Sequence, residues 1–330
     1  MKYPSTQNAI VITGAGGPEV LELRELRVPK PGPQQVLIQV IAAGVNRHDC
    51  NQRAKGTHHD GNPVPGLEAS GEIVAVGTEV QGLAPGDQVM TLLQGGGYAE
   101  YALAESPLVM PLPDGVTPTE AAGLPEALFT AWWNFFGLMK LQPGETVMIH
   151  GGTSGVGHLA IQALSALGYR VVATAGSAKK IAAAKSFGAC AAFNYRDKGL
   201  ADQVMAATDG AGIDALLDMS AGAHIENDLA MMATGGRIAH LSPGRGATLG
   251  LPLRELMAKR VAITGSLLRP LELALKVKTA DLIRQDVLPL IGTQVKPTIA
   301  AVYPLSDAAQ AHREMEKGRH IGKILLKVPE

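Results

Sequence analysis

A glycine-rich segment near the middle of the chain has the residue types needed to bind a phosphate group. It runs from Gly151 to Gly157, after the apolar run Thr146–His150 and before a helix-like stretch. Glycines permit a tight turn, and a helix N-terminus offers free N–H groups to a pyrophosphate. Ser154 replaces the second glycine of the strict Gly-x-Gly-x-x-Gly pattern and adds a hydroxyl. The segment predicts a dinucleotide site formed by Gly152, Ser154, Gly155, Val156 and Gly157, and a tight turn without a ligand is the alternative.

The residues after the next predicted strand indicate which dinucleotide binds. NAD sites usually carry an acid about 20 residues after the glycine motif, where it binds the ribose 2′-OH. This chain has no acid there and reads Ala173-Thr174-Ala175-Gly176-Ser177-Ala178-Lys179-Lys180. A hydroxyl and lysines suit a 2′-phosphate. We therefore predict NADPH rather than NADH, and the alternative is that the lysines only form the solvated face of the next helix.

Around these residues the chain alternates short apolar strands with helices. Six strands are predicted, at Thr146–His150, Arg170–Thr174, Ala191–Phe193, Ile213–Asp218, Arg237–Leu241 and Val261–Thr264. Strands alternating with helices are typical of an α/β, doubly wound parallel sheet of the Rossmann type. The apolar stretch Ala121–Leu141 is interrupted by Pro125 and Glu126, so we interpret it as a buried helix and not as a membrane span.

The first part of the chain, about 120 residues, has short β-rich runs separated by Gly and Pro turns. Gly14-Ala15-Gly16-Gly17 resembles a nucleotide loop, but Pro18 follows and no helix pattern succeeds it, so we predict a turn between two edge strands. The tail from about Leu268 predicts a long helix and a final strand, Lys323–Val328. These patterns indicate a mostly β region beside the doubly wound sheet.

Composition restricts the classes of function. A chain of 330 residues suits two domains. The 29 basic and 30 acidic residues leave a net charge of −1, which predicts neither a nucleic-acid nor a membrane partner. Only Cys50 and Cys190 are present, so a disulfide framework and a four-cysteine zinc lobe are excluded. The N-terminus lacks a signal-peptide pattern, and we expect a cytoplasmic protein.

Several short strings occur in the order found in medium-chain quinone oxidoreductases. They are Gly17-Pro18-Glu19-Val20-Leu21, Gly44-Val45-Asn46, Gly66-Leu67-Glu68-Ala69-Ser70-Gly71, Ser154-Gly155-Val156-Gly157, Thr174-Ala175-Gly176-Ser177, Phe193-Asn194-Tyr195 and Gly322-Lys323-Ile324. The chain resembles the zinc-independent medium-chain dehydrogenases/reductases over nearly its whole length. The strings Gly95-Gly96-Gly97, Pro125-Glu126-Ala127 and Ser266-Leu267-Leu268-Arg269 resemble the tumour-suppressor-induced branch most, with zeta-crystallin more distant.

The resemblance implies an architecture and a set of site residues. It implies a GroES-like, mostly β catalytic domain at 1–123 and 268–330, a Rossmann NADPH-binding domain at 124–267, an active cleft between them and a homodimer, often made through edge strands of the Rossmann sheets. By resemblance Asn46, Arg53 and Thr130 lie near the nicotinamide and its ribose. The remaining implied cofactor contacts are Gly176, Ser177, Lys180 and Tyr195 around the 2′-phosphate, and His240, Ser242, Gly265, Ser266, Leu267 and Lys323 near the nicotinamide half.

Two departures from the relatives bear on the chemistry. Zinc alcohol dehydrogenases carry Cys at the position of Asn46 and His at that of Leu67, and a catalytic zinc needs about three protein ligands. Glu68 alone is not a site, and His58-His59 is expected to be an exposed loop pair, so we predict no metal. Many relatives also carry a tyrosine near Arg53 that is missing here. We therefore expect a remodelled acceptor pocket lined by His58, Tyr98 and Phe129.

The resemblance and the absence of an acid–base motif favour an NADPH-dependent quinone reductase. Hydride transfer to a quinone, with ortho-quinones preferred, gives a stabilised hydroquinone anion, so positioning is the protein's main task. One alternative is an enal or enone reductase in which the Tyr98 hydroxyl polarises the carbonyl. An alternative of another class is a low-turnover NADPH-binding structural or RNA-interacting protein, against which the balanced charge argues.

Overall fold

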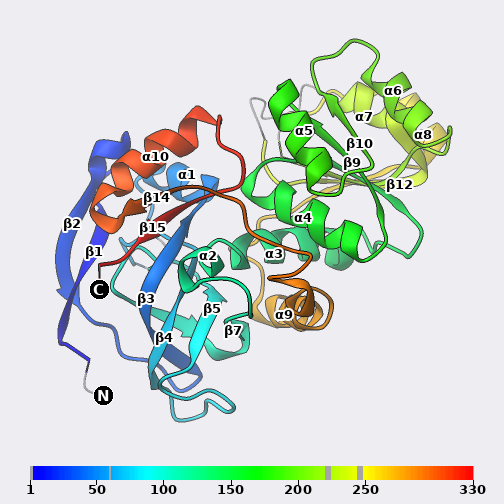
Figure 1. The fold of residues 1–330 in the computed structure, drawn as a ribbon. Helices are drawn as coiled ribbons and strands as arrows, with labels where there is room; N and C mark the ends of the chain where they lie inside the picture. Colours follow the sequence, from blue (N-terminus) through cyan, green and yellow to red (C-terminus); the bar gives the residue numbers. More distant parts are fainter. Residues whose placement is uncertain (1–2, 59–60, 220–223, 244–247, 330) are drawn as a thin grey trace. The chain divides into compact units, whose positions relative to one another are not determined.

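Six parallel strands form one sheet of the computed structural model, which describes residues 3–58, 61–219, 224–243 and 248–329 (Figure 1). The strand order is β10-β9-β8-β11-β12-β13. The order reverses between β8 and β11, which is the topological switch point of a doubly wound sheet. The strands are β8 (Thr146–His150), β9 (Arg170–Ala175), β10 (Ala191–Asn194), β11 (Ile213–Asp218), β12 (Met232–His240) and β13 (Ala262–Gly265). All six predicted strands are confirmed, but β12 begins earlier than Arg237 because Met232 pairs with Ile213 across a bulge.

Helices flank this sheet. They are α4 (Gly155–Ala166), α5 (Ala178–Ser186), α6 (Leu200–Ala207), α7 (Ile225–Met231), α8 (Leu253–Lys259) and α9 (Leu273–Asp286), with the 3-10 turn η4 (Leu288–Leu290). The core beneath α6, α7 and α8 contains Met148, Val172, Leu216, Leu229 and Ile238. This burial of apolar side chains on both faces explains why the strands read as continuous apolar runs.

The apolar stretch before the glycine loop is a buried helix, as predicted. Here α3 (Pro125–Trp132) runs directly into the π-helix η3 (Trp133–Leu138). The side chains of Phe129, Trp132 and Phe135 are fully buried. Among the residues that the structure describes, no helix has the length and apolar character required to cross a membrane.

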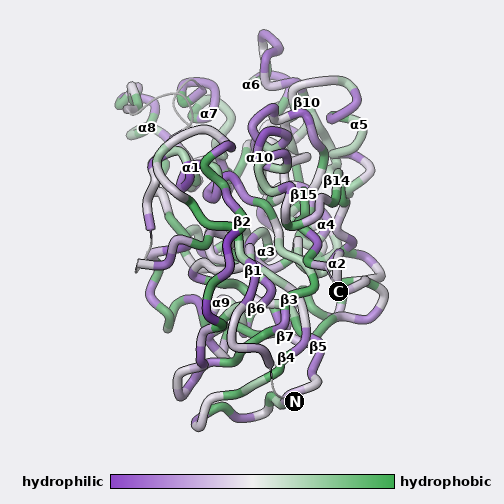
Figure 2. Tube along the Cα trace, turned by 90° about the vertical axis from the view of Figure 1, so that its left-hand side faces the viewer, coloured by the Kyte–Doolittle hydropathy of each residue, from purple (hydrophilic) through white to green (hydrophobic). Residues whose placement is uncertain are grey.

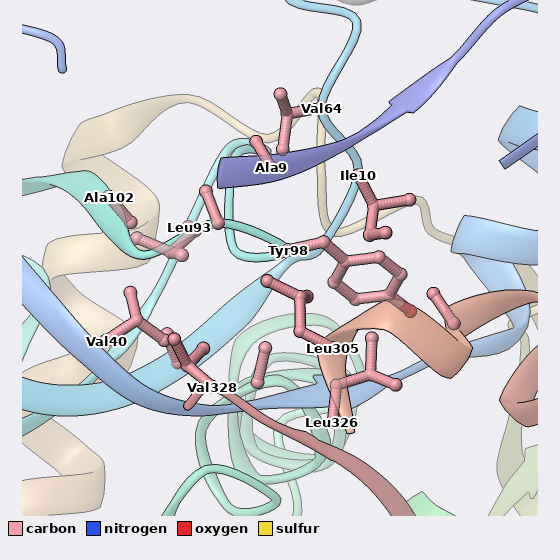
Figure 3. Close-up of a cluster of buried hydrophobic side chains, with 14 of the residues drawn as sticks. Ala9, Ile10, Val40, Val64, Leu93, Tyr98, Ala102, Leu305, Leu326 and Val328 are labelled. Atoms are coloured by element: carbon pink, nitrogen blue, oxygen red, sulfur yellow. The ribbon is translucent and has the colours of Figure 1, made fainter. Parts of the chain in front are cut away.

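Both ends of the chain build a second, mostly β unit. Its sheet follows the order β14-β15-β3-β4-β5-β7, and β6 also pairs with β3. The strands are β3 (Gln35–Val45), β4 (Glu68–Val76), β5 (Gln88–Leu92), β6 (Tyr101–Glu105), β7 (Val109–Pro111), β14 (Ile299–Pro304) and β15 (Lys323–Lys327). Because β15 pairs with β3, the C-terminal strand is part of the same core as the N-terminal region. Figure 3 shows Leu326 of β15 in this core, near Tyr98 and Leu305.

Short helices and a separate hairpin complete this unit. The helical segments are η1 (Pro18–Val20), α1 (Arg47–Lys55), η2 (Ser106–Leu108), α2 (Pro118–Ala121), η5 (Leu305–Asp307) and α10 (Ala308–Lys317). Strands β1 (Thr6–Ile12) and β2 (Leu21–Arg27) pair antiparallel on either side of the Gly14–Gly17 turn, which confirms the predicted turn between two strands. Hydrophobic and hydrophilic residues follow one another along β2 (Figure 2), and most of this strand is partly or fully exposed, with only Leu21 buried.

The chain divides into two compact units, Met1–Ala127 with Ile291–Glu330, and Leu128–Leu290. The predicted fold class, a Rossmann sheet plus a mostly β unit, is confirmed by these sheets. This division places α9 in the Rossmann unit, whereas the sequence-based division assigns 268–290 to the other domain. The functional domain boundaries stay a prediction.

Candidate functional site

The glycine loop connects the end of β8 to the N-terminus of α4. Gly151 adopts a positive φ of 73°, and a Cβ at Gly157 would lie 2.4 Å from the carbonyl oxygen of Gly151. Ser154 is the N-cap of α4, and its Oγ accepts a hydrogen bond of 2.9 Å from the N–H of Gly157. The remaining N–H groups of this first turn, which includes Gly155 and Val156, are oriented as in an anion-binding helix terminus. A loop that only glycine can form, at the N-terminus of a helix, fits a pyrophosphate.

A second set of polar groups lies where β9 meets α5. Ser177 is the N-cap of α5 and accepts a hydrogen bond from the N–H of Lys180 at 3.3 Å. The ring of Tyr195 packs against Gly176, since a Cβ there would lie 3.0 Å from Tyr195 Cε1. The structure thus brings together Gly176, Ser177, Lys180 and Tyr195, the residues assigned to the 2′-phosphate from the sequence.

Arg196 is a member of this set that the sequence analysis missed. Its guanidinium carbon lies 4.7 Å from the centre of the Tyr195 ring, and Nη1 donates a 2.9 Å hydrogen bond to the carbonyl oxygen of Gly176. No carboxylate of the described residues pairs with this exposed guanidinium. The available signal was its position directly after Tyr195, because a planar guanidinium stacks well on an aromatic ring and binds phosphate through two N–H groups.

The ends of the late strands hold most of the other predicted cofactor contacts. His240 of β12 places Nδ1 3.1 Å from Asp218 Oδ2 of β11, and the two residues are register partners. Ser266 donates a 2.9 Å hydrogen bond to Asn134 Oδ1, and the Asn134 amide donates to the carbonyl oxygen of Thr130 at 2.8 Å. Gly265 pairs with His240 at the end of β13, Ser242 lies just after β12, and the side chain of Leu267 is largely exposed.

In the mostly β unit, three buried polar side chains contact one another. Lys323 Nζ donates to Glu68 Oε1 at 2.6 Å and to Asn46 Oδ1 at 2.7 Å, and Asn46 Nδ2 donates to the same Glu68 oxygen at 2.8 Å. The N–H of Glu126 donates to Glu68 Oε2 at 2.9 Å. Gly44 is needed beside them, because a Cβ there would lie 2.0 Å from Glu68 Oε1. Strands β3, β4 and β15 are neighbours in the sheet, which brings these three side chains together from distant parts of the chain.

Tyr98 belongs to a second buried network. Its hydroxyl lies 3.0 Å from Asp49 Oδ2 and 3.2 Å from His312 Nε2, and its side chain is fully buried. Burial, together with the charge of Asp49, raises the pKa of Tyr98 well above its usual value. Burial, reinforced by the charge of Arg53, lowers the pKa of His312 to about 3, so this imidazole is neutral. The Tyr98 hydroxyl is engaged in these contacts, which do not support its use for polarising a carbonyl.

The other residues assigned to the acceptor side are divided between the two units. Arg53 is buried at the end of α1 and forms an ion pair with Glu316 of α10. His58 Nε2 lies 2.9 Å from the carbonyl oxygen of Ile12. Phe129 is fully buried in α3 and, like Thr130, belongs to the Rossmann unit. The roles of these residues stay predictions.

Replacing Asp49 with Asn is expected to reduce the pH dependence of stability. Burial, opposed by hydrogen bonds from the Asn46 N–H and Tyr98, raises the pKa of Asp49 from 3.8 to about 7. The folded protein therefore holds a proton that the unfolded chain has already released, so the free energy of unfolding falls as pH rises from 3.8 towards 7. In the wild type we expect the free energy of unfolding to fall by on the order of 3 kcal/mol over this pH range, and the variant should not show this fall. Urea unfolding at several pH values measures this, and an unchanged pH profile would contradict it.

Clusters suited to a metal ion are absent from residues 3–58, 61–219, 224–243 and 248–329, since no three His, Cys, Asp or Glu side chains gather there. His59, one of the two adjacent loop histidines, lies outside these residues. The absence of zinc stays a prediction.

Comparison with known proteins shows the family of this chain. A zinc-binding dehydrogenase model matches residues 155–279, and an alcohol dehydrogenase GroES-like domain model matches residues 32–114. Quinone oxidoreductase of Sus scrofa is 35% identical over 330 residues, which cover 97% of each chain. The chain belongs to the medium-chain dehydrogenase/reductase family. Human quinone oxidoreductase is 33% identical over 329 residues, covering 96% of this chain and 97% of its own.

Solved structures of this family have the same fold. A quinone oxidoreductase of Pseudomonas syringae pv. Tomato DC3000 matches with a TM-score of 0.83 and 28% identity, covering 97% of this chain and 99% of its own. A mycobacterial protein in complex with NADPH matches with a TM-score of 0.81 and 27% identity, covering 97% of this chain and 99% of its own. An NAD-dependent alcohol dehydrogenase matches with a TM-score of 0.86 and 32% identity, covering 98% of this chain and 100% of its own.

These relationships make the protein an oxidoreductase that uses a nicotinamide nucleotide. They do not decide between the two nucleotides, because one structural relative is named for NAD and another was solved with NADPH. The branch within the family likewise stays a prediction.

Proposed function

We propose that this protein is a zinc-free, NADPH-dependent quinone reductase. Bound NADPH supplies a hydride, which carries two electrons to the quinone, and a proton from water completes the hydroquinone. The observation that carries the proposal is the Asn46–Glu68–Lys323 cluster, because it places an ammonium group among the residues that would otherwise hold a metal. The quinone itself requires little acid–base help, since its reduction produces an aromatic anion.

The cluster supports a site without zinc for two chemical reasons. A catalytic zinc is usually bound by three protein ligands, each a thiolate, an imidazole or a carboxylate. Asn46 and Leu67 provide none of these groups. Glu68 is the remaining carboxylate, and its Oε1 accepts hydrogen bonds from Lys323 and Asn46 while Oε2 accepts from the N–H of Glu126. A divalent cation bound to Glu68 would have to displace a buried ammonium that lies 2.6 Å away.

The preference for NADPH is supported by the groups at the end of β9. No acid stands there to bind a ribose 2′-OH. Ser177 provides a hydroxyl, Lys180 in the first turn of α5 provides one cation, and Arg196, which stacks on Tyr195, provides a second. The glycine loop can pack against the first turn of α4 because Gly157 has no Cβ, which would lie 2.4 Å from the carbonyl oxygen of Gly151. In this arrangement Ser154 orients the loop, and Arg196 and Lys180 orient the adenosine half.

Turnover with two acceptor classes tests the substrate assignment. We expect NADPH oxidation with an ortho-quinone to exceed that with a simple enone by on the order of 10-fold in kcat/KM, because the enone requires a polarised carbonyl and protonation of carbon. Steady-state kinetics with both acceptors at equal NADPH concentration measures this. A faster reaction with the enone would contradict the proposal and would favour an enone reductase instead.

We also infer a homodimer formed through the edge strand β13. Among the described residues this strand is the last of the Rossmann sheet, and large apolar side chains are exposed in α8 and directly after β13, namely Leu253 at 60%, Met257 at 71% and Leu267 at 67%. An unpaired edge with an apolar border is suited to pairing with a second copy. The cytoplasmic location, like the dimer, stays a prediction.

Ala262→Lys is expected to convert the dimer to a monomer, because a twofold contact through β13 would bring two added charges close together. Sedimentation equilibrium measures the mass. Leu23→Lys on β2 is the matched control, since Leu23 is also exposed (49%) but lies in the other unit. A monomeric wild-type protein, or an Ala262→Lys protein that remains dimeric, would overturn this interface.

A further inference from the structure

A buried histidine stands directly before the glycine loop. His150 is the last residue of β8, is 3% exposed and is followed by Gly151. Its Nδ1 lies 2.7 Å from Thr174 Oγ1, and its Nε2 lies 2.9 Å from Asp228 Oδ1. The carbonyl oxygen of Thr174 also accepts the N–H of Gly152 at 2.9 Å. His150 is therefore connected to the loop both through the chain and through Thr174, and the proposed reaction assigns it no task.

Acidic groups surround this imidazole. Asp228 of α7 is 1% exposed, and its Oδ2 has no hydrogen-bond partner among the described residues. The charge of Asp218 in β11 also favours protonation of His150. The ring centres of His150 and His224, the N-cap residue of α7, are 6.4 Å apart. Burial alone would lower the pKa of His150, but the hydrogen bond and charge of Asp228 outweigh it, so the pKa is raised above its usual value of 6.5. The imidazole therefore stays protonated to a higher pH than an ordinary histidine.

We propose that His150 is a positioning residue for the glycine loop and couples nucleotide binding to the uptake of a proton. With Asp228 ionised, the pair carries no net charge when His150 is protonated and one negative charge when it is neutral. The pyrophosphate is anionic, so a protonated His150 favours its binding at the adjacent loop. Thermodynamic linkage requires the reverse effect as well, so NADPH binding favours protonation of His150. This inference rests on the proposed NADPH site.

Protonation also reverses a hydrogen bond at Thr174. In neutral His150, Nε2–H donates to Asp228, and Nδ1 accepts from the Thr174 hydroxyl. In the protonated form Nδ1–H donates to Thr174 Oγ1, and the hydroxyl hydrogen must turn to another acceptor. Because the Thr174 backbone holds Gly152, this change occurs at a residue that orients the loop.

Calorimetric titration of the full-length protein with NADPH tests the coupling. Titrations in buffers of different ionisation enthalpy, between about pH 6 and pH 9, give the number of protons taken up. We expect the wild type to take up on the order of half a proton near the pKa of His150 and to lose roughly 5-fold or more in affinity as pH rises through it. His150→Gln should abolish this uptake, while any contribution of the NADPH phosphate remains in both proteins.

Two further variants make the result interpretable. Asp228→Asn keeps the imidazole but removes the charge that favours its protonation, so the uptake should also be lost. His320→Gln, in the other unit, should leave the uptake at the wild-type level. Equal uptake in wild type, His150→Gln and Asp228→Asn would overturn this inference while leaving NADPH binding intact. A wild-type protein that shows no NADPH binding at any pH would overturn the proposed function itself.

Discussion

Lys323→Met is expected to lower the free energy of unfolding by about 3–5 kcal/mol, the usual cost of leaving one partner of a buried ion pair uncompensated. Lys323 and Glu68 are 1% and 0% exposed at their side chains, with 2.6 Å between Nζ and Oε1. Without the ammonium, Glu68 keeps a buried negative charge with only the Asn46 amide and the N–H of Glu126 as partners. Urea unfolding at neutral pH, with the transition followed by tryptophan fluorescence, measures the loss.

The double variant Glu68→Gln/Lys323→Met is the control. It removes both charges, and the amide that replaces the Glu68 carboxylate could donate to Asn46 Oδ1 and accept from the N–H of Glu126. We therefore expect it to recover most of the lost stability, because a neutral, hydrogen-bonded replacement of a buried ion pair is often tolerated. A single variant as stable as wild type would contradict the account of the cluster. A double variant as unstable as the single one would show that loss of packing, and not the unpaired charge, is responsible.

Arg196→Ala/Lys180→Ala is expected to weaken NADPH binding by roughly 100-fold, with each single variant losing about 10-fold. The estimate takes about 1.5 kcal/mol for each charge-assisted contact with the 2′-phosphate. Arg196 is preorganised by its stacking on Tyr195 and its hydrogen bond to Gly176, so little flexibility is lost when the phosphate binds. Affinity for NADH should change little, since NADH has no 2′-phosphate.

Direct binding measurements with NADPH, NADH, and the fragments 2′,5′-ADP and 5′-AMP test this preference independently of turnover. Lys179→Ala is the matched control, because Lys179 is an exposed lysine in the same turn of α5. It should retain affinity for NADPH. Equal losses for NADPH and NADH in the double variant would remove the assignment of the 2′-phosphate pocket.

The sequence predicts the local parts of this structure well. Strands and helices of the Rossmann unit follow from apolar runs bounded by glycine, whereas the N-cap role of Ser154 is seen only in the structure. Strands and helices of this kind are determined by residues that are close together in the sequence. Ser177 was likewise noted as a hydroxyl after the second strand, and its N-cap role at α5 is seen only in the structure.

Contacts between distant residues could not be predicted in the same way. Lys323 meets Glu68 across 255 residues, and Tyr98 meets His312 across 214 residues. Their partners depend on how the C-terminal β15 and α10 pack against the N-terminal part of the mostly β unit. Tyr98 was assigned to an acceptor pocket from its position, yet tertiary packing places its ring in the core and its hydroxyl against Asp49. His150 was likewise missed because its importance depends on Asp228, which follows 78 residues later.

Turnover of an ortho-quinone by metal-stripped protein is the most direct test of the central claim. The protein would be dialysed against a chelator, its metal content determined, and NADPH oxidation followed with and without added zinc. The Lys323 ammonium fills the place beside Glu68, so we expect full activity without metal and no stimulation by zinc. Loss of activity on chelation that is restored by zinc would contradict the account and require a metal site built from other residues.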